Sequence, residues 1–385
     1  MMDSALNNTS FAAQLQCAAS ETDSTTLKVI KTVLYSLIMV AALLGNLFII
    51  IIVYKKKNMR RTTNIFIANM AASDIFIAAV VSPRILIELY IGPRLWLIDG
   101  IFGSFLCKLC FFFTDFSVSI SIISHAVIAV DRFWAIVYSL RPSLFTRSRR
   151  KYIIAFIWLY SFLFHSPNLY AHRLQERNGA NFCMLDWSPL DNKTSKKTFF
   201  GVIFIMVICI PVILMTVLYS WLVISLNSKK SFSSQTSEVR KQRRKEDIRV
   251  LIKVVAMVIM FLCCLIPITV LALLMYYAWD GNLVCSAWGY AFVAHMLFVS
   301  NSAINPWLCI CIHESYRRHI RKMFSSWRYL STESQRHRNQ TFSESCERTK
   351  IHSIINTNQM RLKSNDANRK LLLHCDNAVV KESCL

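Results

Sequence analysis

One carboxylate, Asp74, lies within a long apolar stretch, and oxygen-bearing side chains recur in three other apolar stretches. These side chains belong to Asn46, Ser121, Asn301, Ser302 and Asn305. A charge at the centre of a bilayer is costly, so such a residue usually has a function. Oxygens gathered around one carboxylate suit a hard monovalent cation, or a proton with waters. A hydrogen-bond cluster that only holds helices together fits the same residues equally well.

A second set combines one arginine with two carboxylates. Asp131 directly precedes Arg132, and Asp247 lies at the start of a later apolar stretch. An arginine at the edge of a membrane is stabilised by pairing with a carboxylate, and either aspartate could supply one. The alternative is a group of interfacial charges that extend toward water.

Covalent catalysis is not expected from this chain. No nucleophile, base and orienting residue fall at an interpretable spacing. No cysteine pair has the spacing of zinc ligands. We therefore predict neither an enzyme nor a metal site, apart from the monovalent cation.

Seven long apolar stretches must position these side chains. Each reaches or approaches the roughly 20 residues that a helix needs to cross a bilayer. The stretches run over residues 31–54, 65–91, 104–137, 152–169, 199–226, 250–278 and 284–312. With 54% hydrophobic and only 17% charged residues, the sequence predicts an all-α membrane protein, a bundle of seven transmembrane helices.

The basic residues set the orientation of this bundle. Of the 44 Lys and Arg residues, 34 lie on the tail and alternate loops of one face. Lys and Arg favour the cytoplasmic side, so the amino terminus is predicted to be extracellular. The net charge of +22 is then explained without nucleic acid. Asn7, Asn8 and Asn192 are glycosylation acceptors on predicted extracellular segments.

Four regions follow from this topology. Residues 1–30 form an extracellular, glycosylated tail, and residues 31–312 form the bundle. Residues 313–327 are expected to form a short amphipathic helix on the inner membrane surface. Residues 328–385 are rich in Ser, Asn, Arg and Lys, so we expect a disordered cytoplasmic tail.

Several residues, taken in order, carry a family resemblance. They are Gly45-Asn46, Asp74, Cys107, Asp131-Arg132-Phe133, Trp158, Pro211 with Tyr219, Pro267 and Asn305-Pro306. On seven spans of the predicted topology, this order resembles the rhodopsin-like, class A G-protein-coupled receptors, and among them the peptide receptors. The resemblance extends over about residues 30 to 327.

The resemblance implies roles for residues near the inner half of the bundle. Arg132 would meet the G protein, and an ionic lock to Asp247 would favour the closed state, with Asp131 and Tyr219 beside it. Transmission from outside to inside would use Ile122, Pro211, Phe261, Leu265 and Pro267. The polar set around Asp74 would hold a sodium ion as an allosteric modulator, and no other cofactor is expected.

Four cysteines lie in predicted extracellular segments. The resemblance implies a disulfide between Cys107 and Cys183. A second bridge from Cys17 to Cys285 is an alternative to two free thiols, because connectivity cannot be read from a sequence.

Two departures from the family pattern fall on its switching residues. Leu265 replaces a tryptophan and Cys309 replaces a tyrosine. Both large aromatic groups are lost, and Cys309 cannot offer a phenolic hydroxyl to Tyr219. These changes put the ease of activation and the basal activity in doubt.

The residues in the outer half of the bundle restrict the class of ligand. Val299 occupies the position of the lysine that retinal pigments need, and Thr114 occupies that of the carboxylate in aminergic receptors. The outer half instead offers a mixed set of charged, polar and aromatic residues, which we call the outer polar set: Arg84, Glu88, Thr114, Asp115, His165, Tyr276 and His295. Such a wide polar mouth suits a peptide. The alternative is that these charges pair with one another.

We therefore predict a multi-pass plasma-membrane receptor that binds an extracellular neuropeptide and activates heterotrimeric G proteins by a closed-to-open rearrangement of its helices. A class A receptor for a non-peptide small molecule and a constitutively active orphan remain alternatives, and a transporter or channel is more remote. Other expected partners are arrestin, through phosphorylated tail residues, membrane lipid, and a PDZ-type domain at Ser383-Cys384-Leu385.

Overall fold

The computed structural model describes residues 24–138, 142, 144–177, 179–231, 238–279, 283–312, 314–322, 325 and 333. Within the helices, only the backbone is described at 226–231, 238–247, 249, 250 and 253. The chain divides into two units, residues 1–317 and 318–385, and the fold below is that of the first. The predictions for residues 1–23, for the tail beyond 333 and for the side chain of Asp247 lie outside the described residues.

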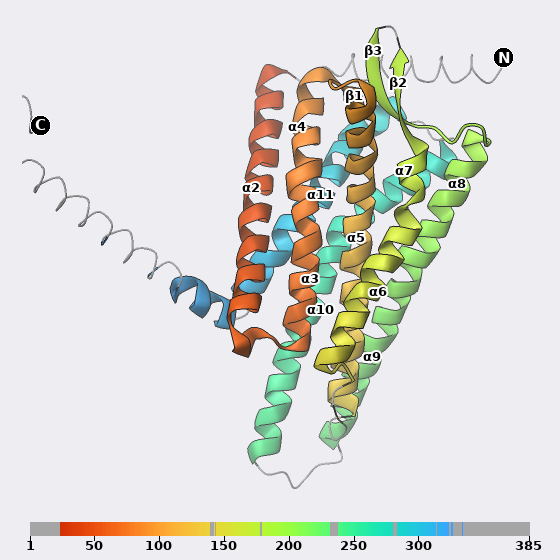
Figure 1. The fold of residues 1–385 in the computed structure, drawn as a ribbon. Coiled ribbons are helices and arrows are strands. Elements are labelled where there is room, and N and C mark those ends of the chain that lie inside the picture. Colours follow the sequence, from red (N-terminus) through yellow and green to blue (C-terminus); the bar gives the residue numbers. More distant parts are fainter. Residues whose placement is uncertain are drawn as a thin grey trace, which may run out of the picture. The chain divides into compact units, whose positions relative to one another are not determined.

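Seven helical spans cross the first unit, which confirms the predicted bundle (Figure 1). Four spans consist of two or more consecutive elements. The spans are α2 (Thr25–Lys55); α3 (Thr62–Phe76), η2 (Ile77–Val81) and α4 (Ser82–Ile91); α5 (Gly100–Val137); α6 (Arg147–His165) and α7 (Pro167–Ala171); α8 (Asn192–Ile203), η3 (Phe204–Cys209) and α9 (Ile210–Ser231); α10 (Glu238–Leu273) and η4 (Leu274–Ala278); and α11 (Trp288–Ile312), which η5 (Cys285–Ala287) precedes. A further short 3-10 turn, η1 (Lys57–Met59), follows α2, and residues 314–322 are helical.

The first span begins earlier than its apolar stretch predicts. The side chain of Ser24 accepts a hydrogen bond from the backbone N–H of Leu27 at 3.2 Å and caps α2. A serine in this position satisfies an amide of the first turn that would otherwise lack a partner. The apolar stretch misses this added segment because Thr25, Thr26 and Lys28 interrupt its apolar residues.

Prolines account for several irregularities within the spans. The wide turns η2 and η3 lie directly before the helices whose second residues are Pro83 and Pro211. Proline cannot donate to the preceding turn and its ring pushes that turn apart, so wide turns are a common accommodation. The hydroxyl of Ser82 donates to the carbonyl oxygen of Ile77 at 3.1 Å and satisfies one acceptor there.

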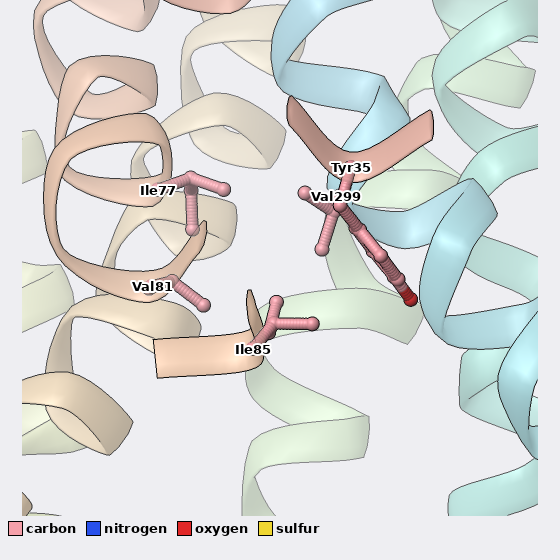
Figure 2. Packing of buried hydrophobic residues seen from close by; sticks show 5 residues of the cluster. All are labelled: Tyr35, Ile77, Val81, Ile85 and Val299. Atoms are coloured by element: carbon pink, nitrogen blue, oxygen red, sulfur yellow. The ribbon is translucent and has the colours of Figure 1, made fainter. Parts of the chain in front are cut away.

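Helix α5 is the central element of the bundle and contacts α3, α6, α9 and α10. Helix α2 packs between α3 and α11, and α10 packs on α11. In the outer half, Tyr35, Ile77, Val81, Ile85 and Val299 form one buried apolar cluster that joins α2, η2, α4 and α11 (Figure 2). Through the hydroxyl of Tyr35, which lies 3.5 Å from Nδ1 of His295, this cluster adjoins the outer polar set.

A small antiparallel sheet lies at the outer end of the bundle (Figure 1). Its order is β1 (Leu95–Trp96), β3 (Ala180–Leu185) and β2 (His172–Arg177), with Leu95 opposite Phe182 and Leu174 opposite Cys183. The β2–β3 hairpin turns at Gly179, whose φ of +74° suits glycine. The sheet holds the second outer loop over the helix ends.

Candidate ligand-binding and signalling sites

The polar core surrounds Asp74 in α3, which is only 3% exposed. Ser121 on α5 and Asn305 on α11 are close enough to act on its carboxylate. Neither of them meets the geometry of a direct hydrogen bond, and both are buried without one among the described residues. One oxygen of Asp74 and the side-chain oxygen of Asn301 are in the same condition. Buried oxygens without partners call for water or an ion, so these four residues fit a monovalent cation.

Two other members of the predicted set join helices instead. The amide nitrogen of Asn46 donates to the carbonyl oxygens of Ala42 and Ser302, both at 2.9 Å. The hydroxyl of Ser302 donates back to the carbonyl oxygen of Val299 at 2.8 Å. Asn46 and Ser302 thus hold α2 against α11 at the level of the polar core.

Trp158 ties the fourth span to the bundle. Its indole nitrogen donates to the side-chain oxygen of Asn69 at 2.8 Å, and the amide of Asn69 donates to Ser124 at 3.0 Å. This chain connects α6, α3 and α5. The sequence singled out Trp158 but gave no sign of its partners.

Most of the predicted transmission residues meet in one place. Ile122, Phe261 and Leu265 form a buried apolar cluster between α5 and α10. Ile208 of η3 packs against it, and Pro211 is buried one turn later, at the second position of α9. Leu265 therefore fills the cluster as a plain apolar residue, two positions before Pro267 inside α10.

His125 is a core residue that the sequence reasoning missed. It is 1% exposed, and neither ring nitrogen has a hydrogen-bond partner among the described residues. Its ring lies 5.1 Å from that of Phe261, between centroids. On α5 it lies one turn after Ser121 and two turns before Arg132. The sequence could have indicated this residue, because a histidine stands within an apolar stretch on the same helix as Ser121 and Arg132.

At the inner end, Arg132 pairs with its neighbour. Its Nε donates to Oδ2 of Asp131 at 3.1 Å, and Nη2 contacts the same oxygen. The charge of Arg132 also acts on Tyr219, whose hydroxyl has no hydrogen-bond partner within the described part of the chain. The side chain of Asp247 is not among the described ones, so the lock to Arg132 stays a prediction.

Cys309 has an aromatic neighbour from outside the span. Tyr316 is fully buried, and its hydroxyl is close enough to Cys309, which is buried as well, for the two groups to influence each other. Burial raises the pKa of Tyr316. A tyrosine thus stands beside position 309, although it comes from seven residues later in the chain.

Five residues of the outer polar set fall into two groups, of which the first surrounds Arg84. Arg84 and Glu88 form an ion pair one turn apart, at 2.6 Å, as the charge-pairing alternative anticipates. The guanidinium of Arg84 lies over the ring of Phe111, 4.6 Å from its centroid, and its charge acts on His295. His295 approaches the hydroxyl of Tyr35 at 3.5 Å. The charge of Arg84 is therefore largely compensated by Glu88 and Phe111 within the protein.

The second group surrounds Asp115, whose side chain is exposed. Asn168 of α7 donates to its carboxylate at 2.9 Å. The carboxylate acts electrostatically on Tyr276, and the ring of Tyr276 stacks on Phe200 at 4.9 Å.

Two predicted pocket residues, Thr114 and His165, are less available for contact with a ligand. The hydroxyl of Thr114 donates to the carbonyl oxygen of Cys110 at 2.8 Å. His165 is only 2% exposed, so a ligand does not reach it in this conformation.

His172 connects the outer sheet to the helices. Its ring stacks on Phe111, 4.3 Å between centroids, and Nδ1 lies 3.1 Å from the carbonyl oxygen of Asn168. Burial, aided by the charges of Arg94 and Arg84, lowers the pKa of His172 to about 3. The imidazole is thus neutral at physiological pH and can donate from Nδ1 to that carbonyl.

The structure confirms the disulfide between Cys107 and Cys183, whose Cα atoms are 5.7 Å apart. It ties β3 to the start of α5. Cys285 is also disulfide-bonded, whereas Cys17 lies outside the described residues, so the pairing of these two stays a prediction.

Asn192, a predicted glycosylation acceptor, is engaged in hydrogen bonds. Its Nδ2 donates to Asp186 at 2.8 Å, and its Oδ1 accepts from the backbone N–H of Trp187 at 2.7 Å. Partial burial acts to raise the pKa of Asp186, but hydrogen bonds from Asn192 and Ser188 outweigh it and lower that pKa. A glycan on Nδ2 would compete with this network. Asn7 and Asn8 lie outside the described residues.

These features define a membrane receptor: seven spans, a disulfide-held outer loop, a polar core and an arginine at the inner end. The chain belongs to the family described as 7 transmembrane receptor (rhodopsin family), whose model matches residues 45–308. It is accordingly a multi-pass protein of the plasma membrane and a G-protein-coupled receptor, and not an enzyme.

The chain is similar to several curated receptors along most of their length. Galanin receptor type 1 of Mus musculus is 29% identical over 301 residues, which cover 77% of this chain and 81% of that receptor. QRFP-like peptide receptor of Branchiostoma floridae is 28% identical over 312 residues, which cover 77% of this chain and 77% of that receptor. Substance-P receptor of Aquarana catesbeiana is 24% identical over 363 residues, 89% of this chain and 84% of that one.

Proposed function

We propose that this receptor binds an extracellular neuropeptide and activates heterotrimeric G proteins. The observation that carries the proposal is the similarity to a galanin receptor, a QRFP-like peptide receptor and a substance-P receptor over three quarters or more of the chain. The outer end supports it, because a hairpin fixed by Cys107–Cys183 stands beside exposed polar side chains. A peptide backbone needs such hydrogen-bonding partners.

Activation is a shift between a closed and an open arrangement. An agonist that binds the open state more tightly raises its population. The Ile122–Phe261–Leu265 cluster lies between the outer polar set and Arg132, so a repacking of this cluster would couple the two ends. Opening would release Arg132 toward the G protein.

The test is G-protein dissociation in cells that express the chain, measured with a library of free and amidated peptides. A peptide response that disappears in Arg132→Ala at equal surface expression supports the proposal. Strong Arg132-dependent signalling without peptide, and no peptide response, would instead identify a constitutively active receptor. That second candidate is favoured by Leu265 and Cys309, which replace the aromatic switches of the family.

A sodium ion is a further part of the proposal. Asp74 would supply the charge, and Ser121, Asn301 and Asn305 would supply uncharged oxygens, since these buried atoms lack partners among the described residues. The ion would favour the closed state by filling the polar core. The Arg132–Asp247 lock would act in the same direction at the inner end.

Three more partners complete the proposal. Arrestin would read phosphorylated Ser and Thr residues of the tail. Anionic lipid would meet the basic segment that includes Lys241, Arg243, Arg244 and Lys245. A PDZ-type domain would add Ser383-Cys384-Leu385 to the edge of its sheet.

A further inference from the structure

Asp115 is an exposed carboxylate without a counter-ion in the part of the chain that the structure describes. Within the described residues its hydrogen bond comes from Asn168, at 2.9 Å, and no described basic side chain lies within ion-pair distance of it. Its neighbour in the outer polar set, Glu88, is by contrast neutralised by Arg84. Asp115 therefore carries the one carboxylate of the set that the described residues leave unpaired.

The position of Asp115 on α5 turns it toward the interior of the bundle. Residues 115, 118 and 122 share one face of a helix. Val118 and Ile122 of this face pack against Phe261 and Leu265 of α10. Asn168, the donor to Asp115, is only 2% exposed, and the charge of Asp115 reaches Tyr276 of η4. The exposed carboxylate thus faces space among the helices and not the lipid.

Charged side chains also lie nearer the outside, where a ligand would enter. Arg94, after the second span, acts on Lys196 of α8, and the carboxylate of Asp186 acts on the same lysine with the opposite sign. Arg94 also acts on Tyr276. The rim thus carries charges of both signs, whereas Asp115 carries a negative charge that no described residue pairs.

We propose that Asp115, oriented by Asn168, binds a cationic group at the inserted end of the ligand. On the proposed function, on which this inference rests, that group is the amino terminus or a Lys or Arg side chain of the peptide. A charge pair in a partly dehydrated site gives both selectivity and affinity. The neutral analogue would leave the carboxylate without a partner.

A first experiment tests the attraction for cations without any ligand. Thr114→Cys places a thiol beside Asp115, and its labelling rate is measured on intact cells with methanethiosulfonate ethylammonium and with the ethylsulfonate. The receptor with Thr114 intact corrects for native thiols. We expect the cation-to-anion rate ratio to fall at least about tenfold when Asp115→Asn is added. An unchanged ratio would overturn the inference, whatever the ligand is.

A second experiment uses paired peptides in the G-protein dissociation assay. Each peptide is made with Lys or Arg, with norleucine, citrulline or Glu in its place, and with a free or acetylated amino terminus. We expect the cationic member to be at least about tenfold more potent on the wild type, and Asp115→Asn to remove this difference. Asp115→Lys should prefer a Glu-containing member, a gain that misfolding cannot produce.

The outcomes separate the two proposals. Equal potency of cationic and neutral members would refute the role of Asp115 and leave a peptide receptor standing. If no peptide acts on the wild type, the peptide proposal fails, and the labelling ratio alone decides whether Asp115 is a cation site for another class of ligand.

Discussion

Gly45 of α2 lies so close to Pro306 of α11 that a β-carbon on it would come within 2.8 Å of the proline Cγ. It would also come within 3.1 Å of the indole nitrogen of Trp307, which donates to the carbonyl oxygen of Ala41 at 3.0 Å. The first and last spans thus touch backbone to ring, directly beside the Asn46–Ser302 hydrogen bond. Glycine is required at position 45 because the close approach of α11 leaves no room for a β-carbon, and not because of its φ angle.

We expect Gly45→Ala to lower the stability of the receptor by about 1–3 kcal/mol, as overpacking of a close contact does. The measurement is thermal unfolding of purified receptor in detergent. Gly289→Ala in α11 is the matched control, because nothing lies within 4 Å of its added β-carbon. This control should be neutral or slightly stabilising, since alanine favours a helix. Equal melting temperatures for the two variants would show that α2 and α11 can separate without cost.

Motifs with fixed spacing were the part of the site that the sequence could predict. Gly45-Asn46 and Asn305-Pro306 are separate motifs in the sequence, and only the structure joins them at one helix contact. The seven apolar stretches likewise depend only on composition and order, whereas the Cys107–Cys183 bridge was predictable only through the family resemblance.

The direction of individual side chains could not be predicted. Asp115 and His165 were equal candidates, yet one is exposed and the other is 2% exposed, because helix rotation and packing decide this. In the second and fifth spans, the wide turns before Pro83 and Pro211 also change the helix rotation by amounts that a regular 3.6-residue period does not contain. Tyr316 beside Cys309 is a contact made after the span ends, where no repeat applies.

Removing the charge beside Arg132 tests what holds the inner end closed. Asp131→Asn should raise ligand-free signalling about fivefold, if the pair is worth about 1 kcal/mol at this partly exposed site. The readout is G-protein dissociation at matched surface expression. Asp247→Ala is compared in the same cells and is expected to raise it as well. A rise in one variant alone would assign closure to that aspartate, and no rise in either would reject pairing of Arg132 as the restraint.

The sodium proposal predicts a salt-specific stabilisation. Purified receptor should melt at a higher temperature in NaCl than in choline chloride of equal ionic strength, since an ion that binds only the folded state stabilises it by mass action. Asp74→Asn should abolish the difference between the two salts. Asn46→Ala should lower both melting temperatures and keep the difference, because Asn46 joins helices. A salt difference that persists in Asp74→Asn would place the ion elsewhere.

The outer loop should respond to acid through His172. Its pKa in the folded protein is about 3, below the roughly 6.5 of an unfolded chain. The folded state therefore binds fewer protons, and stability, full above about pH 6.5, falls as the pH drops toward 3. At pH 5 the loss due to this residue is about 2 kcal/mol. His172→Phe keeps a ring on Phe111 and removes the titrating group.

The measurement is the change in melting temperature between pH 7.5 and pH 5. Other buried histidines contribute to it in both proteins, so the difference between the wild type and His172→Phe isolates this one. We expect a smaller acid-induced drop in the variant, together with a lower melting temperature at pH 7.5, because the hydrogen bond to Asn168 is lost. Equal drops would mean that the hairpin releases His172 to water before the bundle unfolds. The stacking of Phe111 between His172 and Arg84 would then not contribute to global stability.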